Sequence, residues 1–218
     1  MKKFDIQKFE QYVAQNSTEE IKKNILSVIK GRICHHKVRF LNLLVNFMEG
    51  DIKNYLEIGV HNVASMSYVL QSKYKVENCV GIDLFEDTFY KDNLSYSKNI
   101  ENFKTLNVNN NNIKLVKGNS ASTDTINEVN NLKYDLIFID GDHSYDGIKN
   151  DFNNYYLLLS DNGILVFDDF NKGHHDSYDF INSVIDSNIF KFNYEFIDNE
   201  HIGKYKNGII AFSMFSGM

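Results

Sequence analysis

Proline and tryptophan are absent from this chain of 218 residues, and cysteine occurs only as Cys34 and Cys79. Two cysteines are too few for a disulfide framework or for a zinc site made of cysteines. No apolar run approaches the roughly 20 residues that a membrane-spanning helix needs. The two lysines near the start are not followed by the apolar stretch of a secretory signal. We therefore expect a cytoplasmic protein that has reduced thiols and no membrane partner.

An excess of basic residues is also lacking. Lys and Arg number 23 against 29 Asp and Glu, which gives a formal net charge of -6. Neutralising nucleic-acid phosphates needs clustered basic side chains, whereas here they are scattered among acidic ones. This balance argues against a nucleic-acid partner. The hydrophobic content of 43% is ordinary for a globular protein, and the length suits one domain with a full core.

The pattern of apolar residues divides the chain near Gly50. Residues 1–50 carry apolar side chains at helical spacing, and Ser17-Thr18-Glu19-Glu20 looks like a capping box with Ser17 as N-cap. From residue 51 onward, short apolar runs alternate with amphipathic stretches. We expect an N-terminal helical extension or lid over 1–50 and one structural unit over 51–218.

The apolar runs after residue 50 are short, rich in Ile, Val, Leu and Phe, and bounded by Gly, Asn or Asp. They are typical of strands buried on both faces of a parallel sheet. The predicted strands are 55–58, 79–84, 113–116, 134–139, 164–167, 190–197 and 208–214, with helices near 64–73, 121–131, 145–159 and 176–187. This alternation predicts an α/β, Rossmann-like, doubly wound, mostly parallel sheet. The last two runs lack a helix between them, which predicts a hairpin and an antiparallel C-terminal edge strand.

Ligands of open parallel sheets bind beyond the carboxyl ends of the strands. There the first run continues into Gly59, where backbone can approach a ligand closely. Asp83 stands near the end of the second run. Its distance along the chain from Gly59 is close to the roughly 20 residues expected of an acidic residue that binds both ribose hydroxyls. Asn119 and Ser120 follow the third run, where a backbone amide or carbonyl can meet an adenine edge. The alternative reading of Asp83 is a helix N-cap.

The missing glycines decide between two cofactors. A nicotinamide enzyme normally carries G-x-G-x-x-G, but only Gly59 stands between Gly50 and Gly81. Without the second glycine, a pyrophosphate cannot approach the backbone at the start of the helix closely. S-adenosylmethionine contains no phosphate and needs no such approach, so the pattern favours this methyl donor.

The strongest signal lies after the fourth and fifth runs. Asp140 ends one, and the pair Asp168-Asp169 ends the other. If these strands are neighbours, three carboxylates converge, and a hard divalent cation such as Mg²⁺ or Ca²⁺ would relieve their repulsion. The cation would hold a substrate oxygen and lower the pKa of its hydroxyl. The alternative reading makes Asp168 and Asp169 loop or cap residues, and Asp142 a turn residue.

The stretch Asp-Gly-Asp-His-Ser-Tyr-Asp-Gly from Asp140, followed by Asn-Gly-Ile-Leu-Val-Phe-Asp-Asp, resembles class I methyltransferases of the macrocin O-methyltransferase and "methyltransferase 24" type. Leu-Glu-Ile-Gly-Val, Gly-Ile-Asp and Gly-Asn-Ser are similar to that family's cofactor motifs in the same order. The resemblance spans roughly residues 55–170. It implies metal ligation by Asp140, Asp168 and Asp169. It implies S-adenosylmethionine binding by Glu57, Gly59, His61, Ser65, Asp83, Asn119, Ser120 and Asp140.

The same resemblance implies that the general base is Asp142 or His143. We favour His143, because an imidazole has the better unperturbed pKa for removing a proton near neutral pH. Asp142 would then orient His143 or assist the metal. The alternative role for His143 is to cap the next helix.

These features predict a metal-assisted O-methyltransferase acting on a hydroxyl of a small molecule, such as a sugar or another polyhydroxylated metabolite. A phenol or catechol substrate is an alternative, because the same carboxylate site would suit vicinal oxygens. A catalytically silent S-adenosylmethionine-binding protein is another, because Val63 stands where the family usually keeps a second glycine. A homodimer is a possible assembly. Candidates for substrate or lid contacts are the pairs His174-His175 and His35-His36.

Overall fold

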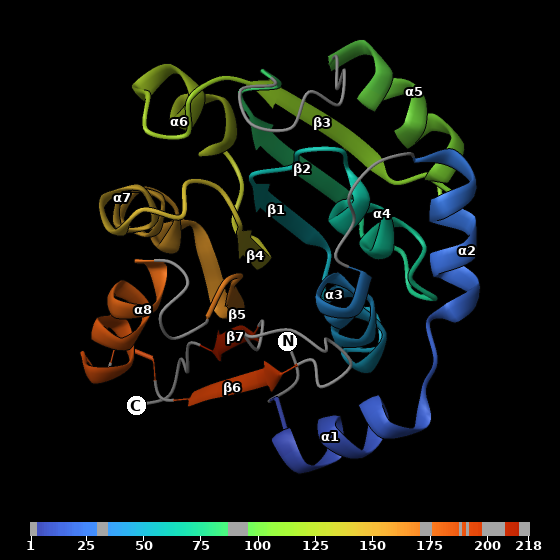
Figure 1. Ribbon diagram of the computed structural model, residues 1–218, viewed down its shortest axis with the longest axis horizontal. Coiled ribbons are helices and arrows are strands. Elements are labelled where there is room, and N and C mark those ends of the chain that lie inside the picture. The colour runs from blue at the N-terminus through green and yellow to red at the C-terminus, as the bar shows by residue number, and fades with distance from the viewer. Residues whose placement is uncertain are drawn as a thin grey trace.

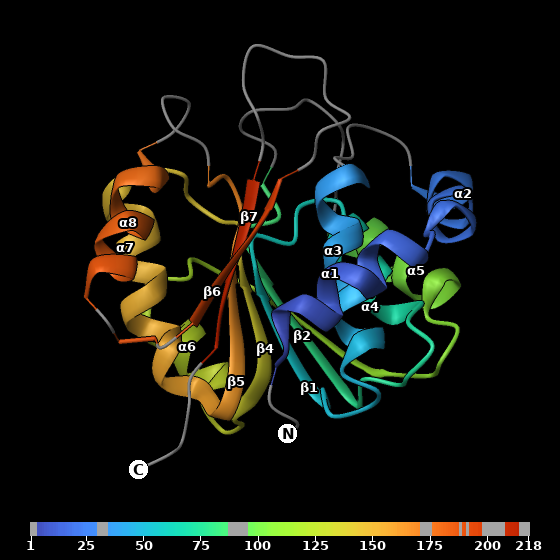
Figure 2. The same ribbon diagram turned by 90° about the horizontal axis from the view of Figure 1, so that it is seen from below.

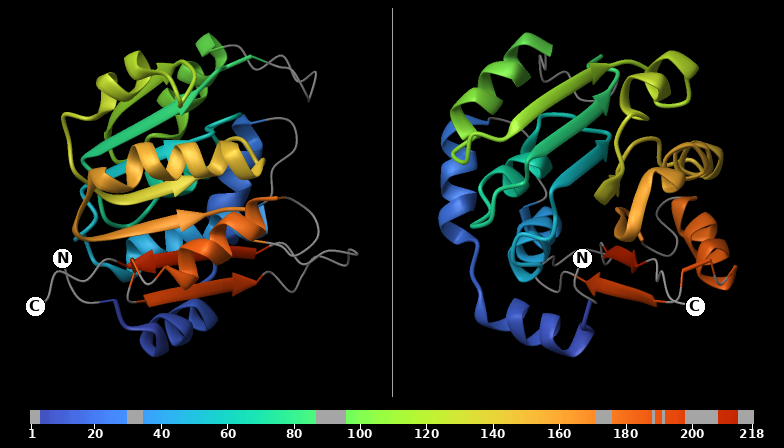
Figure 3. Two further views of the ribbon diagram at one scale, coloured as in Figure 1. Left: turned by 90° about the vertical axis from the view of Figure 1, so that its left-hand side faces the viewer. Right: turned by 180° about the vertical axis from the view of Figure 1, so that it is seen from behind.

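The computed structural model describes residues 4–29, 35–86, 96–170, 176–187, 189–190, 192–197 and 208–213. Within these residues, one seven-stranded sheet has the order β3-β2-β1-β4-β5-β7-β6 (Figure 1). The strands are β1 (Asn54–Ile58), β2 (Asn78–Asp83), β3 (Asn112–Lys117), β4 (Tyr134–Ile139), β5 (Leu159–Phe167), β6 (Phe192–Ile197) and β7 (Gly208–Ser213). Strands β1 to β5 pair in parallel, and β7 runs antiparallel to both β5 and β6 (Figure 3).

Helices cover both faces of the sheet. The helices are α1 (Ile6–Gln15), α2 (Glu19–Val28), α3 (His35–Phe47), α4 (Ala64–Leu70), α5 (Tyr96–Leu106), α6 (Thr123–Val129), α7 (Tyr145–Tyr155) and α8 (Ser177–Asp186), and a 3-10 turn at Tyr156–Leu158 follows α7. Helices α1 to α5 lie on one face, and α6 to α8 lie on the other (Figure 2). The predicted doubly wound, mostly parallel α/β fold is therefore confirmed.

From Leu136 to Ile139 both faces of β4 are buried, which is why these four residues form a continuous apolar run. Leu136 and Phe138 belong to the hydrophobic cluster under α1 to α5. Ile137 and Ile139 belong to the cluster under α6 to α8. Successive side chains of a strand point to opposite faces, so β4 supplies both clusters.

The three N-terminal helices share the first of these clusters. Phe9 of α1, Ile25 of α2 and Leu44 of α3 are completely buried in it, together with Val69 of α4. These helices therefore complete the covering of one face of the sheet. The division into a lid over 1–50 and a catalytic unit over 51–218 stays a prediction.

The C-terminal hairpin closes the sheet with one difference in detail from the sequence-based expectation. The antiparallel strand β7 lies next to β5, from Ile164 paired with Ser213 to Phe167 paired with Ile210. Strand β6 lies outside β7 and forms the edge. The last strand therefore enters between its hairpin partner and the parallel sheet.

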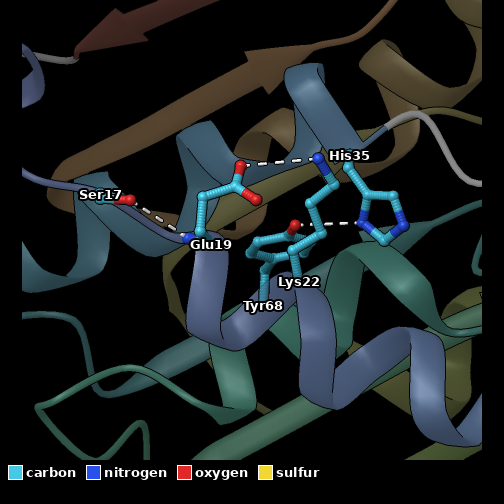
Figure 4. Close-up of polar contacts among 5 residues, drawn as sticks. All are labelled: Ser17, Glu19, Lys22, His35 and Tyr68. Atoms are coloured by element: carbon cyan, nitrogen blue, oxygen red, sulfur yellow. Dashed lines mark hydrogen bonds and ion pairs between the residues drawn. The ribbon is translucent and has the colours of Figure 1, made fainter.

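The start of α2 corrects the predicted capping box. The helix begins at Glu19, and its N-cap is Thr18, whose side chain makes no capping hydrogen bond. The Ser17 hydroxyl accepts the Glu19 N–H at 3.3 Å, and Lys22 Nζ lies 3.5 Å from Glu19 Oε1 (Figure 4). Ser17 is therefore not the N-cap, because its hydroxyl bonds the backbone two residues ahead, as in a Ser/Thr turn.

None of the helices in the described ranges combines the length and the apolar content that crossing a membrane requires.

Candidate active site

The carboxyl ends of β1, β4 and β5 lie side by side, and backbone hydrogen bonds continue past the ends of the strands. The Asp140 N–H donates to the Ile58 carbonyl at 2.8 Å, and the Asp168 N–H donates to the Ile139 carbonyl at 3.0 Å. The residues that follow these strands are therefore held at one edge of the sheet, where open α/β sheets bind their ligands.

Gly59 joins two loops at this edge. Its φ is +90°, a left-handed conformation that favours glycine. A Cβ atom at this position would overlap the carbonyl oxygen of Asp140 and the Cα atom of Gly141. The glycine thus permits close contact between the β1–α4 loop and the β4–α7 loop. In this structure its close neighbour is protein backbone.

An Asp, a His and a second Asp meet beside these loops. Ligand atoms of Asp140, His143 and Asp169 all lie within 4.8 Å of one another. The Nδ1 atom of His143 lies 2.6 Å from Oδ2 of Asp169. The side chain of His143 is 44% exposed and that of Asp169 is 11% exposed, so a ligand can reach the imidazole while the protein holds the carboxylate.

Asp168 differs from Asp169 in its surroundings. Asp168 is only 4% exposed. Within the described part of the chain it is not one of the three clustered residues Asp140, His143 and Asp169. Consecutive residues at a strand end point to opposite sides, and Asp169 adds a left-handed turn with a φ of 51°. The cluster thus contains two of the three expected carboxylates, together with an imidazole. Metal ligation by Asp168 stays a prediction.

Asp142 organises the turn that leads into α7. Its Oδ1 accepts the Ser144 N–H at 2.9 Å. Ser144 is the N-cap of α7, and its hydroxyl accepts the Gly147 N–H at 3.1 Å. The cap is therefore Ser144, which removes the alternative that His143 caps this helix. The carboxylate that contacts His143 belongs to Asp169.

Asp83 ties together the loops that follow β1 and β2. Its carboxylate accepts the His61 N–H at 2.8 Å and the Phe85 N–H at 2.7 Å. The helix N-cap reading of Asp83 does not hold, since the chain continues after β2 into a loop. Each carboxylate oxygen can accept more than one hydrogen bond, so these contacts leave capacity for ligand hydroxyls.

Glu57 lies in the interior below the same loops. It is fully buried, and its carboxyl accepts hydrogen bonds from the hydroxyls of Tyr55, at 2.7 Å, and Ser65. Burial raises the pKa of Glu57 to about 8, and the charge of Asp83 adds to this effect. Glu57 is thus a protonatable group that holds Ser65 from below. Its direct contact with a cofactor stays a prediction.

Asn119 and Ser120 form the turn after β3. The Asn119 Oδ1 atom accepts the Ala121 N–H at 2.8 Å, which fixes an Asx turn. The Ser120 carbonyl accepts a hydrogen bond from the Tyr155 hydroxyl at 2.7 Å. The turn lies at the same edge, because the Gly118 N–H donates to the Asp83 carbonyl at 2.9 Å.

Residues 56–170 match the family model described as a methyltransferase domain, of the methyltransferase 24 type, and this is more than half of the chain. The chain belongs to this methyltransferase family. The expectations of a class I methyltransferase and of a methyltransferase enzyme are confirmed.

Known proteins that resemble this methyltransferase differ in how closely they match it. Uncharacterized protein R132 of Acanthamoeba polyphaga mimivirus is 34% identical over 160 residues, which are 72% of this chain and 68% of that protein. The O-methyltransferase of Bacillus cereus, solved with S-adenosylhomocysteine, has a TM-score of 0.62, 16% identity, and coverage of 93% and 96% of the two chains. TomG of Streptomyces achromogenes, an O-methyltransferase of tomaymycin synthesis solved with S-adenosylmethionine, has a TM-score of 0.63, 14% identity, and coverage of 91% of both chains. At such identities the structures establish the fold.

Val63 occupies the position where the methyltransferase family usually keeps its second glycine. It retains a left-handed backbone, with a φ of 65°, although a β-branched residue is strained there. Its side chain is completely buried in the cluster under α1 to α5. The loop thus keeps a glycine-like path, and the valine methyl groups pack into the core.

The remaining histidines of the methyltransferase fall in different places. His61 has a φ of 47°, and its carbonyl accepts a hydrogen bond from Asn99 at 2.9 Å. His35 is the first residue of α3, and its Nδ1 atom lies 3.0 Å from the Tyr68 hydroxyl, in a buried position (Figure 4). His174 and His175, like the side chain of His36, lie outside the described residues.

Two polar residues of α7, Asp151 and Tyr155, lie near the site and were not predicted from the sequence. Asp151 is 2% exposed and lies beside the side chain of Ser120, and the Tyr155 hydroxyl donates a hydrogen bond to the Ser120 carbonyl. A signal was present in the sequence, because Asp151 shares a helical face with Ile148 and Tyr155. A carboxyl on an apolar face needs polar partners inside the protein.

Proposed function

We propose that this methyltransferase transfers the methyl group of S-adenosylmethionine to a hydroxyl oxygen of a small molecule with the help of a divalent cation. The observation that supports this most directly is the Asp140–His143–Asp169 cluster beside the loops that hold Asp83. In this proposal the cluster supplies a base and two anionic ligands next to the nucleoside site.

In this proposal His143 removes the proton from the substrate hydroxyl. A neutral ring whose Nδ1–H donates to Asp169 carries its lone pair on Nε2, and this nitrogen would take the proton. Asp169 then holds the ring in one tautomer and stabilises the imidazolium that forms, as carboxylates do for histidine bases in other enzymes. Asp142 supports the turn that presents His143.

The donor set fits a hard divalent cation. Mg²⁺ and Ca²⁺ prefer oxygen ligands, which Asp140 and Asp169 provide, and this leaves the imidazole for proton transfer. Asp168 is the third predicted ligand. When bound, the cation would lower the pKa of the coordinated substrate hydroxyl.

The nucleoside part of S-adenosylmethionine would lie across the loops after β1, β2 and β3, with its ribose on Asp83. Its sulfonium supplies an electrophilic methyl group. Complexes of TomG with S-adenosylmethionine and of the Bacillus cereus enzyme with S-adenosylhomocysteine support this choice of cofactor. The other residues assigned to it are Glu57, Gly59, His61, Ser65, Asn119, Ser120 and Asp140.

The acceptor we favour is a sugar or another polyhydroxylated small molecule, and a phenol or catechol is the alternative. Both would present an oxygen to the same carboxylates. A silent binding protein is favoured less, since the Val63 side chain packs into the core and the loop keeps its left-handed turn.

Calorimetry with S-adenosylmethionine and S-adenosylhomocysteine, each with and without Mg²⁺, tests the cofactor. We expect binding to the wild type, a loss of about 10-fold or more in Asp83→Ala, and unchanged affinity in Asp161→Ala, an exposed residue of β5. Absence of binding to the wild type would reject the proposal.

Release of S-adenosylhomocysteine in the presence of sugar and catechol acceptors tests the reaction. Turnover with one acceptor class identifies the substrate chemistry. Tight binding of the cofactor without turnover on either class, with or without Mg²⁺ or Ca²⁺, would favour the silent binding protein.

A further inference from the structure

Asp151 lies on α7 where a charged residue is not expected. Its side chain is on the face of the helix that carries Ile148 and Phe152, which pack into the cluster under α6 to α8. Only 2% of the residue is exposed. A carboxyl in such a place reduces stability unless other groups bond it, so its contacts indicate why it is there.

The first contact is with the turn after β3. The side chain of Ser120 lies close enough to the Asp151 carboxyl to favour its charged form. One helical turn later, the Tyr155 hydroxyl donates to the Ser120 carbonyl at 2.7 Å. Residues four positions apart share one helix face, so Asp151 and Tyr155 hold Ser120 from the same side.

The second contact is with the loop after β4. The Oδ2 atom of Asp151 lies 2.9 Å from the position that a Cβ atom on Gly141 would occupy. No donor within the described part of the chain hydrogen-bonds this oxygen. Burial raises the pKa of Asp151 to about 6, against the opposite effect of the Ser120 side chain, and the charge of Asp142 adds to the increase.

The two loops that Asp151 contacts are not neighbours in the sheet. Strands β1 and β2 separate β3 from β4. In the described part of the chain, backbone hydrogen bonds therefore link the Ser120 turn to the Gly141 loop only through these two intervening strands. The loop after β1, which holds Gly59, and the end of β2, which holds Asp83, lie between them.

We propose that Asp151 is a positioning residue that braces the Ser120 turn against the Gly141 loop and so sets the width of the slot for the nucleoside of the cofactor. This inference rests on the proposed function. In this inference a residue of α7 contributes to the affinity for the adenine end of the cofactor. The same helix follows the loop that contains Asp140, Asp142 and His143.

The test compares Asp151→Ala, Asp151→Asn and Tyr155→Phe with Asp161→Asn as the exposed matched control. Dissociation constants of S-adenosylhomocysteine and of 5′-methylthioadenosine, a nucleoside without the amino-acid part, are measured by calorimetry. We expect Asp151→Ala to weaken both ligands by about 10-fold. Asp151→Asn keeps the shape and a hydrogen-bond acceptor, so it should restore most of the affinity.

A purely structural role gives a different result. It would lower the fraction of binding-competent protein, and hence the stoichiometry, with unchanged dissociation constants in Asp151→Ala. That outcome overturns the inference. If Asp151→Ala does not fold, Tyr155→Phe provides the test. We expect it to weaken the binding of both ligands by about 3-fold or more, because one hydrogen bond is lost. An unchanged affinity in Tyr155→Phe would also contradict the inference.

The failure of the proposed function looks different. In that case wild-type protein binds neither ligand, whatever the state of Asp151. A KM for S-adenosylmethionine that rises in Asp151→Ala while kcat stays within about 3-fold would further separate cofactor positioning from damage to the catalytic loop.

Discussion

The imidazole of His143 and the carboxylate of Asp169 approach to 2.6 Å, although they come from loops after different strands. The pairing of β4 with β5 brings these loops together. A carboxylate that fixes a ring nitrogen of histidine leaves the other nitrogen for chemistry. In this contact Asp169 is largely buried in the protein, whereas the ring of His143 is accessible to a ligand.

His143 is expected to act on the proton of the acceptor. His143→Ala should lower kcat by about 10²- to 10⁴-fold, the usual contribution of a general base, with an unchanged affinity for S-adenosylhomocysteine. Asp142→Ala removes only the turn hydrogen bond to Ser144 and should lower kcat less. Measurements of kcat and of binding on the same preparations check this. A larger loss in Asp142→Ala would transfer the role of base to Asp142.

Asp168 and Asp169 are expected to differ in metal binding. Because Asp169 lies in the cluster and Asp168 is buried apart from it, Asp169→Gly should weaken Mg²⁺ or Ca²⁺ binding by about 10-fold or more, and Asp168→Ala should weaken it less. Glycine is used at Asp169 because its φ is 51°. Calorimetric titration with the metal alone gives the answer. Equal losses in the two variants would place Asp168 in the ligand set.

Glu57 is expected to make stability depend on pH. Its pKa is about 8 in the folded chain, against an ordinary value of 4.5, so between these values the folded state holds a proton that the unfolded state has released. The contribution of Glu57 to the free energy of unfolding is therefore fully present below about pH 4.5. It falls as the pH rises to 8, at most by about 1.4 kcal/mol per pH unit. Glu57→Gln imitates the protonated carboxyl and should remove this fall.

Urea unfolding from pH 5 to pH 9 measures the effect as the difference between wild type and Glu57→Gln. Asp151 also has a raised pKa, but it is present in both proteins and cancels in the difference. Glu20→Gln, at an exposed position of α2, serves as the control. A difference between wild type and Glu57→Gln that does not change with pH would contradict the prediction.

The sequence predicted the strands well because each is a short apolar run buried on both faces. The predicted 134–139 agrees with β4 (Tyr134–Ile139). Strand β5 begins earlier than expected, at Leu159, where it pairs with Tyr134 before a register shift. The pattern did not predict this first part because it is mostly polar. Periodicity detects burial, and this part of β5 is held by backbone pairing instead.

The site was predictable to the level of loops and not of side chains. Motif spacing placed Asp140 and the Asp168-Asp169 pair at one edge, but which aspartate faces Asp140 depends on the left-handed turn at Asp169. The bracing contact of Asp151 depends on how α7 packs over two loops that are distant in the sheet. Neither feature follows from local sequence.

Val63 gives the sharpest test of the cofactor loop. A left-handed conformation costs an ordinary residue about 1–2 kcal/mol, whereas burial of the valine side chain contributes about 1.5–3 kcal/mol. Val63→Gly relieves the strain and loses the burial, so its stability should lie within about 2 kcal/mol of the wild type. Val63→Ala loses burial and keeps the strain, so it should be less stable than Val63→Gly, the reverse of the usual order of alanine and glycine near a helix.

The same pair of variants addresses the cofactor. The Val63 side chain is completely buried in the core, so its removal should leave the affinity for S-adenosylmethionine within about 3-fold of the wild type, a change of less than 1 kcal/mol. Urea unfolding and calorimetry on the two variants measure both quantities. A gain of about 10-fold or more in Val63→Gly would mean that valine obstructs the cofactor. The wild-type chain would then be better described as a weakened member of the family than as an efficient methyltransferase.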